Sequence, residues 1–129
     1  MSKYDFSKLQ NGSDIRGVAL PGVPGENVNL DAEVCGRLAK GFLYWLSAFT
    51  NKAPSDLTVT IGMDPRLSGP DLARAFAEAL TPYGTKVCAA GLASTPAMFM
   101  STVFDEVRAD GAVMITASHL PFNRNGLKF

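Results

Sequence analysis

The chain has 129 residues, enough for one domain with a buried apolar core. Its twelve basic residues balance its twelve acidic residues, which argues against a broad electrostatic surface for nucleic acid or membranes. No apolar run approaches the ~18 residues of a membrane span, and the polar start, MSKYDFSKLQNGSD, lacks the apolar centre of a secretory signal. We therefore expect a cytoplasmic protein, or one whose organelle transit peptide has been removed.

Strands and helices alternate along the chain. Residues 1–13 are predicted to be a loose N-terminal arm, and a strand is expected over residues 15–20. A helix capped by Asn29 or Asp31 follows, with apolar side chains at helical spacing. This apolar stripe consists of Val34, Leu38, Phe42, Trp45, Leu46 and Phe49.

The middle of the chain repeats this order. Residues 57–62, LTVTIG, are rich in β-branched side chains and predict a strand. Ser68 and Asp71 form a capping-box-like pair with Pro70 in the first turn, which predicts the start of a second helix. Gly84 is expected to end that helical region.

The last third of the chain completes the pattern. Strands are predicted over residues 86–90 and 112–115, with a helix between them from Thr95 to about Asp105. This alternation indicates a layered α/β domain. Ligands gather at the carboxyl ends of parallel strands. Residues 62–66 and 116–119 both follow strands, so we expect them to lie together at that rim.

Two cysteines, Cys35 and Cys88, lie in apolar patterns and lack the spacing of a metal site. Both are predicted to be buried, reduced thiols, which indicates a reducing compartment. The sequence contains neither G-x-x-x-x-G-K-[ST] nor G-x-G-x-x-G, which argues against ATP or dinucleotide binding.

The last sixteen residues, MITASHLPFNRNGLKF, carry most of the candidate chemistry. An apolar strand leads into a cluster of small polar side chains with one hydroxyl nucleophile, Ser118. No acidic residue follows Asp110, whereas Arg124 and Lys128 do. A serine at the end of a strand, on a tight loop with only basic charges nearby, is well suited to hold a phosphoryl group.

Three segments resemble, in order and spacing, motifs of the α-D-phosphohexomutases, the phosphoglucomutase/phosphomannomutase superfamily. Residues 116–128, TASHLPFNRNGLK, resemble the active-serine loop of that family. Residues 14–17, DIRG, resemble its N-terminal motif, and residues 62–69, GMDPRLSG, resemble its second-strand motif. Leu120 departs from the pattern, because the family usually has asparagine at this position.

The resemblance implies a three-layer α/β/α domain with a mixed, mostly parallel sheet of about four strands. Residues 14–129 would be the first domain of a four-domain enzyme. The other domains of the family bring an aspartate-rich metal loop, a sugar-recognition loop and a phosphate clamp. Because residues 126–129 look like the start of a strand, we expect a fragment of a longer enzyme that exposes an apolar face. Without the metal, sugar and phosphate loops of the other domains, we expect this fragment to be inactive alone.

The resemblance also implies an isomerase of carbohydrate metabolism that interconverts the 1- and 6-phosphates of glucose or mannose by phosphotransfer. Ser118 would carry the phosphoryl group, and its phosphate would bind Mg²⁺ together with aspartates of the absent second domain. A hexose 1,6-bisphosphate would be the activator. His119 and Lys128 would act as catalytic groups, as a proton shuttle and as a general base or charge stabiliser. Arg16 and Arg66 would bind phosphate or substrate.

Plainer interpretations of the same residues remain open. Ser118 can satisfy a turn, and the two arginines can form ion pairs with the neighbouring Asp14 and Asp64. The whole chain can instead be a non-enzymatic α/β binding or regulatory module, with Leu120 as a sign of lost catalysis. A serine hydrolase is disfavoured, because adjacent side chains such as Ser118 and His119 normally diverge and no G-x-S-x-G elbow occurs.

Overall fold

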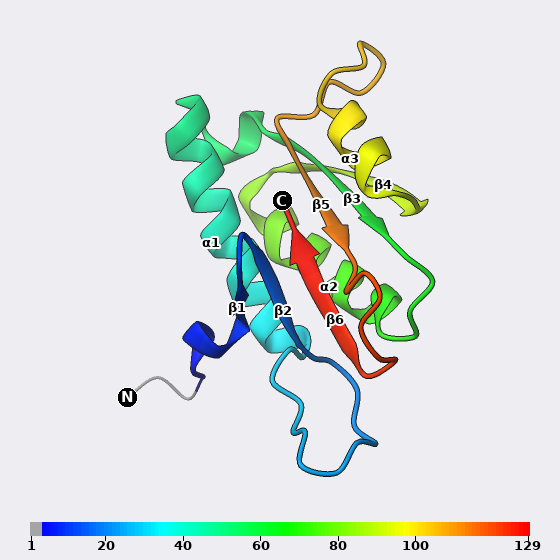
Figure 1. The fold of residues 1–129 in the computed structure, drawn as a ribbon. Helices are drawn as coiled ribbons and strands as arrows, with labels where there is room; N and C mark the ends of the chain where they lie inside the picture. The colour runs from blue at the N-terminus through cyan, green and yellow to red at the C-terminus, as the bar shows by residue number, and fades with distance from the viewer. Residues whose placement is uncertain (1–3) are drawn as a thin grey trace.

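The computed structural model describes residues 4–129, so the first three residues of the predicted arm lie outside the described residues. Among the described helices, none combines the length and apolarity needed to cross a membrane. The elements in chain order are η1 (Phe6–Leu9), β1 (Gln10–Asn11), β2 (Asp14–Val18), α1 (Ala32–Thr50), η2 (Pro54–Asp56), β3 (Thr58–Met63), α2 (Gly69–Leu80), η3 (Thr81–Tyr83), β4 (Lys86–Leu92), α3 (Thr95–Ser101), β5 (Gly111–Ile115) and β6 (Arg124–Lys128), as Figure 1 shows.

In the described part of the chain, six strands form one mixed sheet in the order β1-β2-β6-β5-β3-β4. β3 pairs in parallel with both β4 and β5, whereas β6 lies antiparallel between β5 and β2. β1 and β2 form a short antiparallel pair. The predicted α/β class and the mixed sheet are confirmed. The expectation of about four strands is wrong, because β1 and β6 join the four predicted strands. The expectation of a mostly parallel sheet is also wrong, because the connections into β2 and β6 are too short for the crossover that a parallel strand needs.

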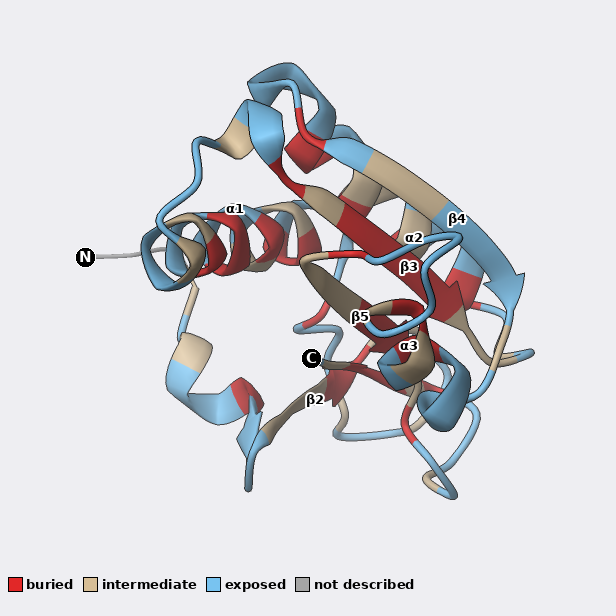
Figure 2. Cartoon of the chain, turned by 90° about the horizontal axis from the view of Figure 1, so that it is seen from above, coloured by how far each residue is buried: buried red, intermediate tan, exposed pale blue. Residues whose placement is uncertain are grey.

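Helices cover both faces of the sheet (Figures 1 and 2). Ile61 of β3 belongs to the core cluster that also contains Leu43 of α1 and Phe76 of α2. A Cβ atom at the next residue, Gly62, would lie 2.6 Å from the sulfur of Met98 in α3. Because neighbouring residues on a strand point to opposite faces, α1 and α2 lie on one face and α3 on the other.

The boundaries of α1 have clear local causes. The Asp31 carboxylate accepts a hydrogen bond from the Val34 N–H at 2.8 Å, which decides between the two predicted caps. The side chain of Asn29 instead accepts from the Val18 N–H at 2.7 Å and ties the helix approach to β2. Asn51 ends the helix in the left-handed conformation, a common helix terminator.

One predicted cap and one predicted helix end differ from the structure. Ser68 occupies the residue before α2, but its side chain makes no capping hydrogen bond. Its hydroxyl instead accepts from the Asn125 side-chain amide at 2.8 Å, and both residues are buried. α3 ends at Ser101, four residues before the predicted end at Asp105, and turns occupy the residues that follow.

The two cysteines differ in accessibility, so the prediction that both are buried holds for Cys35 only. Burial, together with the charge of Asp31, raises the pKa of the Cys35 thiol to about 12. Cys88 is half-buried.

We expect iodoacetamide at about pH 8 to alkylate Cys88 and to spare Cys35, because a protonated, buried thiol reacts slowly. Peptide mass spectrometry checks this, with an unfolded sample as the control; equal labelling in the native protein would contradict it.

Candidate functional site

The connection between β5 and β6, residues 116–123, is called the serine loop below. It begins at the carboxyl end of β5, as expected, and presents Ser118 and His119 to solvent. Ser118 has a φ of 56°, in the left-handed region that favours glycine. Such a backbone costs about 1–3 kcal/mol and persists only where the surroundings impose it, often at functional sites.

Arg66 is the main support of the serine loop. Its guanidinium lies 3.4 Å from the Asp64 carboxylate, and its side chain is only 12% exposed. Both outer nitrogens donate to the loop or to its junction with β6, and each reaches two acceptors. The four acceptors are the backbone carbonyl oxygens of Ser118, Leu120, Pro121 and Arg124, at 2.7, 2.8, 2.8 and 3.1 Å. Arg66 was predicted to bind phosphate; the structure places it at the loop, with its four outer N–H groups directed to the protein backbone.

Asp64 connects the end of β3 to the same loop. One of its carboxylate oxygens accepts from the Thr116 hydroxyl at 2.5 Å, and the other accepts from the backbone N–H of Arg66 at 3.2 Å. The Thr116 oxygen in turn accepts from the Ser118 N–H at 3.0 Å. From the sequence, Asp64 is expected only as an ion-pair partner of Arg66, and Thr116 has no predicted role. Their positions inside two of the motifs were the available signal.

Arg16 contacts the serine loop at Ala117. It donates to the Ala117 carbonyl at 3.1 Å and pairs with Asp14 at 3.3 Å. Lys128 lies 3.6 Å from the same Asp14 carboxylate, because β2 and β6 are antiparallel neighbours. Two cations therefore share one anion beside the loop, and the local charge is positive. The Arg16 Nε atom is buried with no hydrogen-bond partner.

His119 turns back toward Ser118. Its Nδ1 atom lies 3.3 Å from the Ser118 Oγ atom, so the expectation that these adjacent side chains diverge is wrong. The left-handed backbone of Ser118 changes the relative direction of the two side chains. Within residues 4–129 no carboxylate is hydrogen-bonded to the His119 ring, so the described residues do not assemble a hydrolase triad.

The far end of the serine loop is held by Glu26. Its carboxylate accepts from the Asn123 side chain at 2.7 Å and pairs with Arg124 at 3.0 Å. The hydrogen bonds from Arg124 and Asn123 lower the pKa of Glu26 below its usual value. Leu120 occupies the position at which the family usually has asparagine. It contributes to the loop through its backbone, because its N–H donates to the Ala117 carbonyl oxygen at 3.1 Å. The loop therefore has support at both ends.

Replacing Arg66 with methionine is expected to loosen the serine loop. Four hydrogen bonds at about 0.5–1.5 kcal/mol each are lost, so amide exchange over residues 118–124 should rise at least about tenfold. Arg66→Lys keeps the charge but not the planar fork, and we expect it to lie between wild type and Arg66→Met. Hydrogen exchange with mass spectrometry makes the comparison. Unchanged exchange in Arg66→Met would show that the loop holds its shape without the guanidinium.

Comparisons with known proteins point in one direction. The phosphoglucomutase/phosphomannomutase alpha/beta/alpha domain I family matches residues 7–129. A phosphoglucosamine mutase of Acetivibrio thermocellus is 35% identical over 124 residues, which are 96% of this chain and 25% of that protein. A phosphomannomutase of Salmonella muenchen is 37% identical over 108 residues, 84% of this chain and 21% of that protein.

A solved structure agrees with these relatives. The crystal structure of a phosphoglucomutase/phosphomannomutase family protein from Burkholderia thailandensis superimposes with a TM-score of 0.71 at 30% identity. The match covers 90% of this chain and 24% of that one. The chain thus spans about a quarter of the length of the curated relatives it matches.

Proposed function

Because the chain belongs to the phosphoglucomutase/phosphomannomutase family as its alpha/beta/alpha domain I, we propose that it is the phosphoserine-bearing domain of a hexose-phosphate mutase. The enzyme would be an isomerase that exchanges a hexose 1-phosphate and a hexose 6-phosphate. One observation carries the assignment of the serine. Ser118 is exposed in a left-handed conformation that Arg66 and Thr116 hold in place, beside a positively charged cluster.

The proposed reaction moves one phosphoryl group out and another back. The bond from phosphorus to the Ser118 Oγ atom breaks while a bond to a free sugar hydroxyl forms. The hydroxyl proton passes to a base, and the serine oxygen takes up a proton. The resulting sugar bisphosphate then returns its other phosphoryl group to Ser118, so no phosphate is consumed. His119, 3.3 Å from the Ser118 Oγ atom, and Lys128 are the proposed groups for proton transfer and charge stabilisation.

The basic side chains around the loop differ in how many of their donors remain free for a phosphate. Arg16 has five N–H groups and two protein acceptors, so donors remain for a phosphate oxygen. Arg66 uses its outer N–H groups on the loop, and its proposed part in phosphate binding is therefore indirect. Lys128 is 43% exposed and can approach a bound anion.

Mg²⁺ is the proposed cofactor, and a hexose 1,6-bisphosphate is the proposed activator. Bound Mg²⁺ would neutralise charge on the transferring phosphoryl group. A phosphate on Ser118 supplies the hard oxygen ligands that this ion prefers. Residues 4–129 contain no cluster of three His, Cys, Asp or Glu side chains, and Asp14 and Asp64 are paired with arginines. The remaining metal ligands would then come from other domains of the same polypeptide.

The substrate is proposed as a class rather than as one sugar. The two relatives are named for glucosamine and mannose phosphates, so a hexose phosphate is the shared chemistry.

The alternative of a non-enzymatic module rested on Leu120. In the structure Leu120 serves the serine loop through its backbone N–H and carbonyl, which its side chain does not alter, so the geometry does not favour that alternative.

A labelling experiment tests the proposal. The full-length protein is incubated with glucose 1,6-bisphosphate and Mg²⁺, and peptide mass spectrometry locates any phosphoryl group that it gains. We expect one phosphoryl group per chain, on Ser118. Labelling of the Ser118→Ala variant to the same extent would overturn the assignment.

A further inference from the structure

The dipeptide Asn-Gly occurs twice in the chain, and the structure places the two copies in opposite environments. Asn11-Gly12 lies at the turn of the β1–β2 hairpin, where both residues are exposed. Asn125-Gly126 lies in β6, between β2 and β5, where both residues are buried. Glycine has no side chain to shield its backbone nitrogen, so an asparagine side chain that precedes glycine is open to attack by that nitrogen.

No partner within residues 4–129 restrains the reactive atoms of the exposed copy. In this part of the chain neither the Asn11 side chain nor the Gly12 N–H makes a hydrogen bond. Gly12 has a φ of 60°, and a Cβ atom there would meet nothing within 4 Å, so open space surrounds the turn. β1 has only two residues and lies at one edge of the sheet (Figure 1). Such a short edge pair opens locally at little cost.

The same groups are held in place at the buried copy. The Asn125 side-chain amide donates to the Ser68 hydroxyl at 2.8 Å, and its side-chain oxygen accepts from the Gly126 N–H at 2.9 Å. β6 is also hydrogen-bonded to a strand on each side. Attack of the Gly126 nitrogen on the Asn125 side chain needs a turn of the backbone out of the extended conformation. That movement requires the centre of the sheet to open, which costs far more than opening the hairpin.

We propose that Asn11 is a site of spontaneous deamidation, and that the carboxylate formed there neutralises the positive cluster beside the serine loop. The Gly12 nitrogen gives its proton to a solvent base and bonds to the Asn11 Cγ atom. The bond from Cγ to Nδ2 breaks, and Nδ2 leaves as ammonia with a proton from solvent. Water then opens the succinimide ring at either of its carbonyl carbons, which yields aspartate or isoaspartate. One water is consumed for each ammonia released, and no oxidant or reductant takes part.

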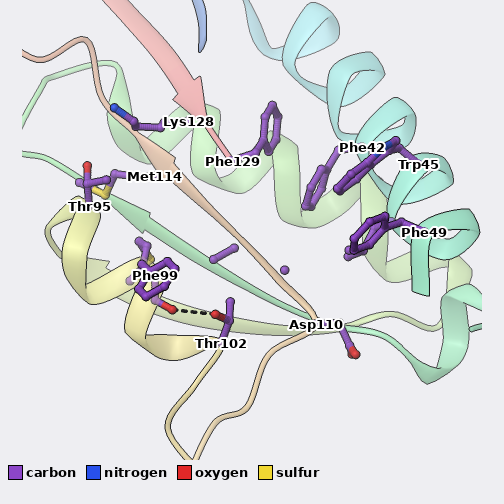
Figure 3. Close-up of a pocket in the computed structure, with 14 residues that line it drawn as sticks. Phe42, Trp45, Phe49, Thr95, Phe99, Thr102, Asp110, Met114, Lys128 and Phe129 are labelled. Carbon is purple, nitrogen blue, oxygen red and sulfur yellow. Dashed lines mark hydrogen bonds between the residues drawn. The ribbon is translucent and has the colours of Figure 1, made fainter. Parts of the chain in front are cut away.

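The strand register places the Asn11 side chain on the face of the sheet that carries the cluster. Asn11 is directly opposite Asp14, so their side chains point to the same face. Asp14 pairs with Arg16 at 3.3 Å and with Lys128 at 3.6 Å. Figure 3 shows Lys128 and Phe129 on opposite sides of β6, with Phe129 turned toward α1. The cluster and Asn11 therefore lie on the face of the sheet away from α1.

Deamidation changes the charge balance of this cluster. Arg16 and Lys128 carry two positive charges, and Asp14 carries one negative charge. A second carboxylate, opposite Asp14, brings the sum to zero. Residues on the diagonal between paired strands, such as Asn11 and Arg16, are about 7–8 Å apart, within the screening length of about 8 Å at physiological salt. The cluster would then attract a phosphate group less strongly, a consequence that rests on the proposed function.

Peptide mass spectrometry of the full-length protein, kept in warm, mildly alkaline buffer, tests the site. We expect Asn11 to convert at least about tenfold faster than Asn125, because only the hairpin opens without disrupting the sheet. In urea-unfolded protein the two asparagines should convert at similar rates, since each precedes glycine. Equal rates in the folded protein would overturn the assignment, and so would a rate ratio that unfolding leaves unchanged. The conversion rates do not depend on mutase activity, so their failure is distinguishable from a failure of the proposed function.

A pair of variants tests the effect of the new charge in the same full-length protein. Asn11→Asp installs the product carboxylate. Gln10→Glu adds the same charge on the opposite face, because Gln10 pairs with Ile15, which packs against the core. We expect Asn11→Asp to raise the KM for hexose phosphate at least about threefold at low salt, with little change in kcat, and added salt to diminish the increase. Gln10→Glu should leave the KM unchanged within error. An unchanged KM in Asn11→Asp, or an equal rise in both variants, would overturn the charge effect.

Discussion

Replacing Ser118 with alanine in the full-length protein is expected to reduce kcat for hexose-phosphate interconversion by at least about 10³-fold while leaving the fold intact. The substitution removes the only atom that can accept the phosphoryl group at this position. Ser118 is exposed, and its contacts with Thr116 and Arg66 run through the backbone N–H and carbonyl, which alanine keeps. A coupled assay of sugar-phosphate conversion measures the activity, and thermal unfolding checks the fold.

Ser13→Ala is the matched control for this prediction. Ser13 is also exposed and lies in the turn between β1 and β2, outside the serine loop. We expect this variant to retain the wild-type kcat. If Ser118→Ala retained activity within about tenfold of wild type, after removal of host mutase, Ser118 could not be the phosphoryl carrier.

Replacing Gly126 with alanine is expected to destabilise the domain by about 3 kcal/mol or to prevent folding. A Cβ atom at this position would lie 2.3 Å from the Ile15 carbonyl oxygen and 2.9 Å from the Thr116 carbonyl oxygen. Both contacts are with backbone, so no side-chain rotation can relieve them. Because β6 lies between β2 and β5, moving it away would weaken the hydrogen bonds on both of its sides. Urea unfolding measures the change in the free energy of unfolding.

The control for Gly126→Ala is the same change at Gly41. Gly41 lies in the exposed face of α1, and a Cβ atom there would meet nothing within 4 Å. Alanine favours a helix over glycine by about 1 kcal/mol, so Gly41→Ala should be neutral or stabilising. A Gly126→Ala variant as stable as wild type would mean that the strands beside β6 separate without cost.

Much of the site was predictable because its signals are local. A strand followed by a small polar loop placed Ser118 at the rim of the sheet, and the motif in residues 62–69 placed Arg66 at the same rim. The roles of the supporting residues were not predictable in this way. Arg66 finds its four acceptors 52 to 58 residues away, and Asp64 meets Thr116 across 52 residues. Those contacts depend on the pairing of β3 with β5.

The amino-acid sequence by itself determined the alternation of helices and strands, a helix start close to Asn29 or Asp31 and the serine at the end of β5. These features depend on side-chain periodicity, caps and turns, which act over a few residues. Only the tertiary structure decided that Ser68 partners Asn125 instead of capping α2 and that β6 lies antiparallel between β2 and β5. Each of these outcomes depends on the register between strands distant in sequence, which no local pattern specifies.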